Sequence, residues 1–131
     1  MDLEFALASV QTDEAYPVNL IEGSSKTEPR VIDWSPMITG VLADVGNGVD
    51  PGLISARFHN ALAESIVLAA REFGIPSVAL SGGCFQNSYL TQRAVHRLRA
   101  EGFRPYWHQR VPPNDGGIAL GQIIAARLNT T

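Results

Sequence analysis

The sequence predicts an α/β protein: a small mixed sheet, with its main strands parallel, flanked by helices. Two observations carry this prediction. From residue 51 onward, helical and strand-like segments alternate in the order helix, strand, helix, strand, helix, which is typical of parallel sheets. The continuous apolar run Ser77-Val78-Ala79-Leu80, bounded by Pro76 and Gly82, indicates a buried strand covered on both faces.

Length and composition narrow the class of protein further. The chain has 131 residues, the size of one domain that can bury a core. Its net charge is −3 without a basic run, so we expect no nucleic-acid partner. No stretch approaches the ~20 apolar residues of a membrane span, and the N-terminal ten residues lack the basic region of a signal peptide. The single cysteine excludes a disulfide framework and fits a reducing compartment such as the cytoplasm.

The chain is expected to form one domain, 1–131, whose character changes near residue 35. Residues 1–34 are polar and turn-rich, and residues 35–131 carry the longer periodic segments of an α/β core. Residues 2–9 suggest the end of a helix. Two β-like runs on either side of a loop-forming stretch predict a hairpin, Tyr16–Ile21 with Arg30–Asp33.

Two helices are expected next. Ser35 as N-cap and Pro36 at the first helical position predict the start of one helix, which Gly46-Asn47-Gly48 ends. A longer helix is expected from Pro51 to Phe73, with Gly74 as its C-cap. The remaining elements predicted are a helix over 87–101, a strand over 105–107, a loop over 111–117 and a helix over 118–128 with Leu120, Ile123 and Ile124 on its apolar side.

The first candidate site is the turn after the predicted strand 77–80. Glycines at this position let backbone N–H groups approach an anion, and a helix begins just beyond. Ser81, Gly82, Gly83 and Asn87 therefore resemble a phosphate- or nucleotide-binding turn, although neither common glycine motif is present. The alternative is a tight turn in which Asn87 only caps the next helix.

The second candidate is the loop before the last helix. Asp115, between Asn114 and Gly116, would place a carboxylate near a helix N-terminus. It serves either as a plain cap or as a metal or phosphate-side ligand. One carboxylate does not hold a metal alone, so a metal would need ligands from elsewhere.

Three further side chains are weaker candidates. His59 and Asn60 lie beside the apolar face of the long predicted helix, where they either reach a cleft or remain ordinary surface residues. Cys84 follows the glycine turn with no histidine close in sequence to act as its base, so it is interpreted as a small packing residue. The other histidines show no metal-ligand spacing.

Three stretches together resemble the C-terminal part of the hydrogenase maturation carbamoyltransferase family (HypF). Their order and spacing make the resemblance specific, and it covers nearly the whole chain. The stretches are Ile54–Ala63 (ISARFHNALA), Val78–Asn87 (VALSGGCFQN) and Arg110–Gln122 (RVPPNDGGIALGQ).

The resemblance implies a fold and a chemistry. The fold would be the second lobe of the actin/Hsp70/sugar-kinase type, in the variant shared with tRNA threonylcarbamoyladenosine transferases (a Kae1-like domain). The family makes carbamoyl adenylate from carbamoyl phosphate and ATP. It passes the carbamoyl group to the C-terminal cysteine of the maturation partner HypE, on the way to the cyanide ligands of the [NiFe] centre. The catalytic residues are not assigned.

The resemblance also implies roles for particular residues. Gly82, Gly83 and Asn87 would lie against the nucleotide, and Asp115 would bind a divalent metal: Mg, Fe or Zn. The residues that would lie next to these ligand-binding residues are Ser81, His59, Asn60, Asn114 and Gly116. The first lobe of the fold has no counterpart in this sequence, so we expect the chain to hold at most half a site, to be inactive alone, and to expose an apolar patch where the missing lobe or a second copy docks.

Two alternative functions remain open at this stage. The chain could be a non-catalytic module that binds a nucleotide or a partner protein. It could also belong to a branch that carbamoylates small molecules or tRNA, although a tRNA partner would favour more basic charge.

Overall fold

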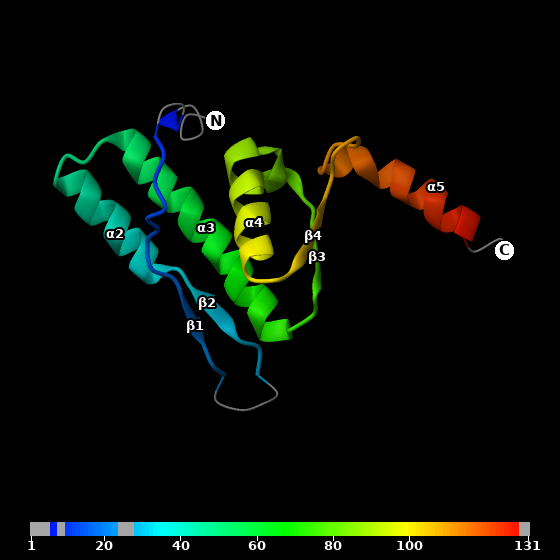
Figure 1. The fold of residues 1–131 in the computed structure, drawn as a ribbon, viewed down its shortest axis with the longest axis horizontal. Coiled ribbons are helices and arrows are strands. Elements are labelled where there is room, and N and C mark those ends of the chain that lie inside the picture. Colours follow the sequence, from blue (N-terminus) through cyan, green and yellow to red (C-terminus); the bar gives the residue numbers. More distant parts are fainter. Residues whose placement is uncertain (1–5, 8–9, 24–27, 129–131) are drawn as a thin grey trace.

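A computed structural model describes residues 6–7, 10–23 and 28–128 (Figure 1). The predicted helix end over 2–9 falls largely outside these residues. The elements are β1 (Asn19–Ile21), β2 (Val31–Asp33), α2 (Ser35–Gly46), α3 (Pro51–Phe73), β3 (Ser77–Leu80), the short 3-10 helix η1 (Gly83–Gln86), α4 (Ser88–Ala100), β4 (Arg104–Trp107), the 3-10 turn η2 (Asp115–Gly117) and α5 (Ile118–Leu128).

The strands form two separate pairs. β1 and β2 are an antiparallel hairpin, as predicted, and β3 and β4 are parallel, with Leu80 opposite Trp107 at their carboxyl ends. The described residues therefore contain two two-stranded sheets, where the sequence suggested one small mixed sheet. The α/β class is confirmed. The hairpin stays apart because it lies beside α2 and α3, whereas β3 and β4 lie beyond α4 (Figure 1).

The main core lies between α3, α4 and one face of the parallel pair. Its fully buried members include Ala63, Val67, Ala94 and Leu98, whose mostly small side chains let the two helices pack closely. From β3, Leu80 is buried and Val78 is half-buried, while Ser77 and Ala79 are exposed. The expectation that this strand is covered on both faces is therefore wrong, because its side chains alternate between the core and an open face.

A second, smaller core joins α2 to α3. Tyr16, Met37 and Ala61 are buried there, so the segment before β1 is held against both helices. Gly40 of α2 makes this possible: a Cβ on Gly40 would lie 2.6 Å from Cδ1 of Tyr16. The Tyr16 hydroxyl donates to Asp44 at 2.6 Å, and Arg57 of α3 donates to the same carboxylate at 2.7 Å.

The helix boundaries follow their predicted signals with one exception. Asp50 caps α3 by accepting from the Leu53 N–H, and Gly74 ends it in the left-handed conformation, φ 63°. Ser35 is not the N-cap of α2, because the helix already includes it. The Asp33 carboxylate accepts the Ser35 N–H at 2.9 Å, which lets the helix begin one residue earlier.

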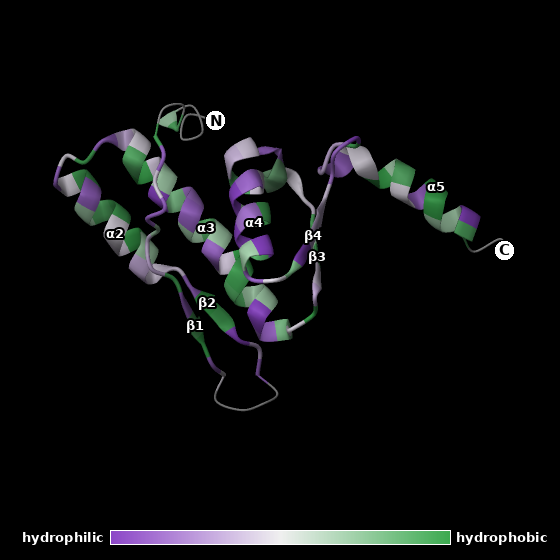
Figure 2. Cartoon of the chain, viewed as in Figure 1, coloured by the Kyte–Doolittle hydropathy of each residue, from purple (hydrophilic) through white to green (hydrophobic). Residues whose placement is uncertain are grey.

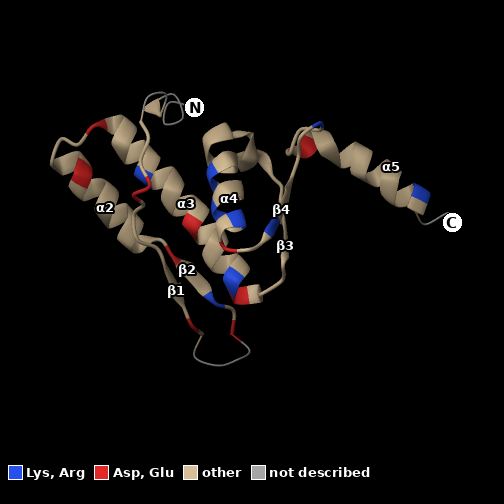
Figure 3. Cartoon of the chain, viewed as in Figure 1, with Lys and Arg blue, Asp and Glu red and all other residues tan. Residues whose placement is uncertain are grey.

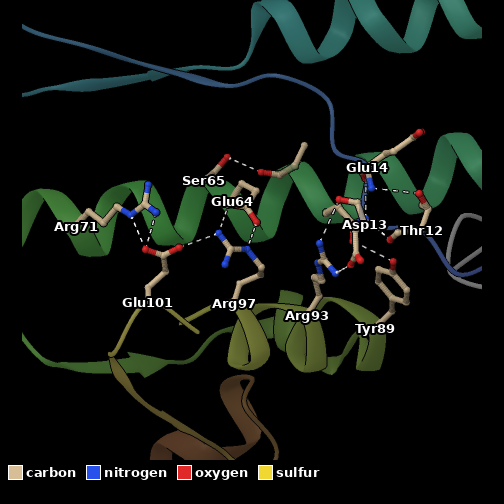
Figure 4. A network of polar contacts seen from close by, with 12 residues as sticks. Thr12, Asp13, Glu14, Glu64, Ser65, Arg71, Tyr89, Arg93, Arg97 and Glu101 are labelled. Carbon is tan, nitrogen blue, oxygen red and sulfur yellow. Dashed lines mark hydrogen bonds and ion pairs between the residues drawn. The ribbon is translucent and has the colours of Figure 1, made fainter. Parts of the chain in front are cut away.

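Ion pairs reinforce the contact between α3 and α4. Basic residues recur along α4, and acidic residues lie on α3 and on the segment before β1 (Figure 3). Glu101 accepts from both Arg71 and Arg97, Arg97 also binds Glu64, and Arg93 binds Asp13 (Figure 4). The pKa of Glu101 is lowered by its hydrogen bonds from Arg71 and Arg97.

The helix α5 leads away from the rest of the molecule (Figure 1), and every described residue in it is exposed. It is rich in hydrophobic residues (Figure 2), among them Ile118, Ile123, Ile124 and Leu128. The expected exposed apolar surface is therefore present. Among the residues described, no helix has both the length and the apolar character that a bilayer crossing requires.

Replacing Gly40 with Ala is expected to destabilise the protein by about 1–3 kcal/mol, because the new methyl group overpacks against Tyr16. An alanine in a helix would otherwise stabilise by about 1 kcal/mol relative to glycine. Urea unfolding followed by circular dichroism measures the difference. Gly46→Ala is the matched control in the same helix, since its Cβ would meet nothing within 4 Å. Equal gains for both variants would contradict the contact.

Tyr16 makes the stability sensitive to alkaline pH. Burial, and then its hydrogen bond to Asp44, raises the pKa of Tyr16 from 10.0 to about 12. The unfolded chain therefore releases this proton first, and the stabilisation is lost as pH rises from 10 to about 12. The difference in unfolding free energy between the wild type and Tyr16→Phe should narrow over this range. A difference that stays constant in denaturant titrations at pH 9, 10.5 and 12 would contradict the assignment.

Candidate functional site

The candidate site lies at the carboxyl edge of β3 and β4. The chain leaves β3 through Ser81 and Gly82, and Gly82 has φ 108° and ψ 160°. This backbone conformation is available essentially to glycine alone. A Cβ on Gly82 or Gly83 would meet nothing within 4 Å, so the backbone of the turn is open to a ligand.

The structure brings the two glycine-containing loops together. The Gly82 N–H donates to the Pro113 carbonyl at 2.8 Å, which holds the turn after β3 against the loop before α5. Within that loop the Asn114 side chain accepts the Gly116 N–H at 3.1 Å. Asn114 therefore provides the cap, and Asp115 begins η2 with an exposed side chain.

Asn87 caps α4, as the sequence suggested. Its Oδ1 accepts the Leu90 N–H at 2.9 Å. Its Nδ2 lies 2.9 Å from Nε2 of His59, so both polar atoms of the side chain already have protein partners. A phosphate contact to this side chain would use the remaining amide hydrogen of Nδ2.

His59 and Asn60 are buried in α3 and do not line an open cleft. Nδ1 of His59 lies 2.8 Å from the Ser55 carbonyl, so it carries the proton, and Nε2 accepts from Asn87. Asn60 donates to the carbonyls of Thr12 and Glu14 and accepts from the Tyr89 hydroxyl at 3.0 Å. His59 thus fixes the start of α4, and Asn60 fixes the segment before β1.

Asp115 does not form a metal site with its neighbours. Over the described ranges, no three His, Cys, Asp or Glu side chains are grouped closely enough to hold an ion. A single exposed carboxylate supplies too few ligands for Mg²⁺ or Zn²⁺. The donor set found here does not fit a complete metal centre.

Two further residues differ from expectation. Cys84 is an exposed free thiol in η1, so its interpretation as a packing residue is wrong. His108 was given no role, yet its Nε2 lies 3.0 Å from Oγ of Ser81. Sequence reasoning missed this contact because it depends on the register of β3 and β4; only the position of each residue after a predicted strand pointed to it.

Asn87→Ala should destabilise the chain by about 1–3 kcal/mol, since it removes the cap of α4 and leaves Nε2 of His59 buried without a partner. Gln86→Ala, at an exposed neighbouring position, is the control and should change stability by less than about 0.5 kcal/mol. Urea unfolding compares the two. Equal stabilities would show that the His59–Asn87 bond contributes nothing.

Comparison with known proteins identifies the family. Residues 1–122 match the family described as carbamoyltransferase, Kae1-like domain, second subdomain. A carbamoyltransferase HypF from Synechocystis sp. is 38% identical over 123 residues, covering 94% of this chain and 15% of the relative. A probable carbamoyltransferase HypF from Methanocaldococcus jannaschii is 41% identical over 115 residues, covering 82% of this chain and 15% of the relative.

Solved structures agree with these relatives. A full-length HypF, crystallised in a phosphate- and nucleotide-bound form, superposes with a TM-score of 0.78 at 36% identity over 97% of this chain and 17% of its own. HypF from T. kodakarensis superposes with a TM-score of 0.71 at 27% identity, over 99% of this chain and 16% of its own. Its structural neighbours give the chain the actin/Hsp70/sugar-kinase type of fold. The chain spans about one sixth of the length of these relatives. The part it matches is the second subdomain of the Kae1-like domain, and the chain belongs to the HypF carbamoyltransferase family.

Proposed function

We propose that this chain supplies one wall of the nucleotide site in a carbamoyltransferase that uses carbamoyl phosphate and ATP, with carbamoyl adenylate as the activated group. The observation that carries the proposal is the open glycine turn at the carboxyl edge of β3 and β4. In open α/β sheets, ligands bind beyond this edge. The nucleotide-bound form of a relative 36% identical to this chain supports a nucleotide here.

The chain's own backbone does most of the binding in this proposal. The absence of a side chain on Gly82 and Gly83 lets phosphate oxygens come close to the turn. The Gly83 N–H would donate to them, because the Gly82 N–H already donates to the Pro113 carbonyl. The bond from Gly82 to the Pro113 carbonyl keeps the turn and the Asp115 loop at a fixed spacing. Asn87 and His59 hold the start of α4 next to the turn, and Asn87 would contact the nucleotide through its remaining amide hydrogen.

Asp115 would contribute one ligand to a divalent cation beside the phosphates. Such a cation would offset the negative charge of the nucleotide. Its other ligands, and the identity of the metal among Mg, Fe and Zn, would come from the rest of the protein, since Asp115 alone does not complete a coordination shell.

The remaining wall of the site would come from a first lobe or from a second copy of this chain. Two exposed surfaces support such a partner. α5 exposes Ile123, Ile124 and Leu128, and the open face of the β3–β4 pair exposes Tyr106. Exposed apolar side chains gathered on a helix and on a sheet face favour burial against another surface.

The acceptor of the carbamoyl group would be the C-terminal cysteine of HypE, during maturation of [NiFe] hydrogenase in the cytoplasm. A thiolate attacks the carbamoyl carbon, and AMP leaves with the electron pair of the broken C–O bond. The names of the relatives, carbamoyltransferase HypF, support the transfer of a carbamoyl group. The HypE cysteine as acceptor is what the resemblance to this family implies.

The test is a chimera in which this chain replaces the matching segment of the Synechocystis relative. Carbamoylation of HypE, followed by intact mass, should be retained. Gly82→Val in the chimera should lower the rate on the order of tenfold or more, because a side chain in this backbone conformation costs about 1–3 kcal/mol. Asp115→Ala should lower it as well and raise the metal concentration required.

The control is the chimera with Gly46→Ala, which lies in α2 and meets nothing within 4 Å. Full activity of the Gly82→Val chimera would show that the glycine turn is not part of the site. Carbamoyl-phosphate-dependent ATP cleavage by the 131-residue chain alone would contradict the proposal that it forms only one wall.

A further inference from the structure

A serine and a histidine meet at the carboxyl edge of the parallel pair. Ser81 directly follows β3 and His108 directly follows β4, one step beyond the facing residues Leu80 and Trp107. Oγ of Ser81 lies 3.0 Å from Nε2 of His108, within hydrogen-bond distance, and both side chains are exposed.

The pair borders the open face of the sheet. Leu80 and Trp107 pack into or against the core behind it. Ser81 and His108 line a hollow of about 230 Å³ together with Ala79, Leu80, Tyr106 and Trp107. Because Ser81 directly precedes Gly82, the pair lies beside the glycine turn and borders this hollow.

The direction of the hydrogen bond between Ser81 and His108 determines whether the Ser81 hydroxyl can donate to an anion. A serine hydroxyl has one hydrogen to donate and two lone pairs, while phosphate oxygens in their ionised form only accept. If the Ser81 hydrogen pointed to His108, none would be left for a phosphate. When Nε2–H of His108 donates to Oγ, the Ser81 hydrogen is free for the ligand at Gly82.

We propose that His108 is a positioning residue that donates Nε2–H to Ser81 and thereby aims the Ser81 hydroxyl at the phosphate oxygens of a nucleotide bound at the glycine turn. This inference rests on the proposed function. It adds a residue that acts through Ser81. Because both side chains are exposed, removing either leaves no cavity and no buried polar atom, so an effect on binding is separable from an effect on folding.

The experiment is a double-mutant cycle in the chimera with the Synechocystis relative, with the affinity for ATP with Mg²⁺ measured by isothermal titration calorimetry. Ser81→Ala and His108→Ala should each weaken binding on the order of fivefold, the size of one hydrogen bond. The double variant should be no weaker than Ser81→Ala alone. His108→Gln should recover most of the affinity, since its side-chain amide also donates an N–H.

The control is His96→Ala, an exposed histidine of α4, which should bind ATP as the wild type does. Wild-type binding together with an unchanged His108→Ala affinity would overturn the inference and leave the proposed function standing. Additive losses in the double variant would also overturn it, because His108 would then act independently of Ser81. If Gly82→Val did not weaken ATP binding by the chimera, the nucleotide site and this inference would both fail.

Discussion

The packing of α3 against α4 is the constraint on which the rest of the structure depends. Small buried side chains such as Ala63 and Ala94 allow the two helices to approach, and the inner face of β3 and β4 closes the same core. The bond between His59 and Asn87 adds a polar link at one end of this interface, where α4 begins. Since the glycine turn lies between β3 and α4, its position is set by a strand and a helix that both belong to one core.

In the candidate site, the residues that hold the backbone in place differ from the residues that a ligand can reach. Buried groups, His59 and Asn60, are committed to the protein itself, each with a full set of hydrogen bonds. Gly83 and Asp115 are exposed at the carboxyl edge of the sheet, and the Gly82 backbone beside them carries no side chain to cover it. In the proposed function, such a surface would bind by shape and backbone polarity and would require a second surface opposite it.

Residue patterns within single segments predicted the helices and strands well, whereas contacts between distant segments were not predicted. α3, β3 and α4 were found to within about one residue, because proline, glycine and asparagine mark their ends. Burial of β3 on both faces was wrong, since a short apolar run does not reveal whether a second layer exists. The pairing of Ser81 with His108 depends on a strand register across 27 residues, and that of His59 with Asn87 on helix packing across 28. Neither leaves a mark in sequence spacing.

The exposed helix α5 has a thermodynamic consequence of its own. A helix of 11 residues that buries nothing is only marginally stable in water, because helices of this length depend on tertiary packing. It therefore lies outside the cooperative unit formed by α3, α4 and β3–β4, and its amide hydrogens should exchange with solvent far faster than theirs. Slow exchange in α5 would be a direct sign that another surface covers it, so this helix reports on assembly without any change to the sequence.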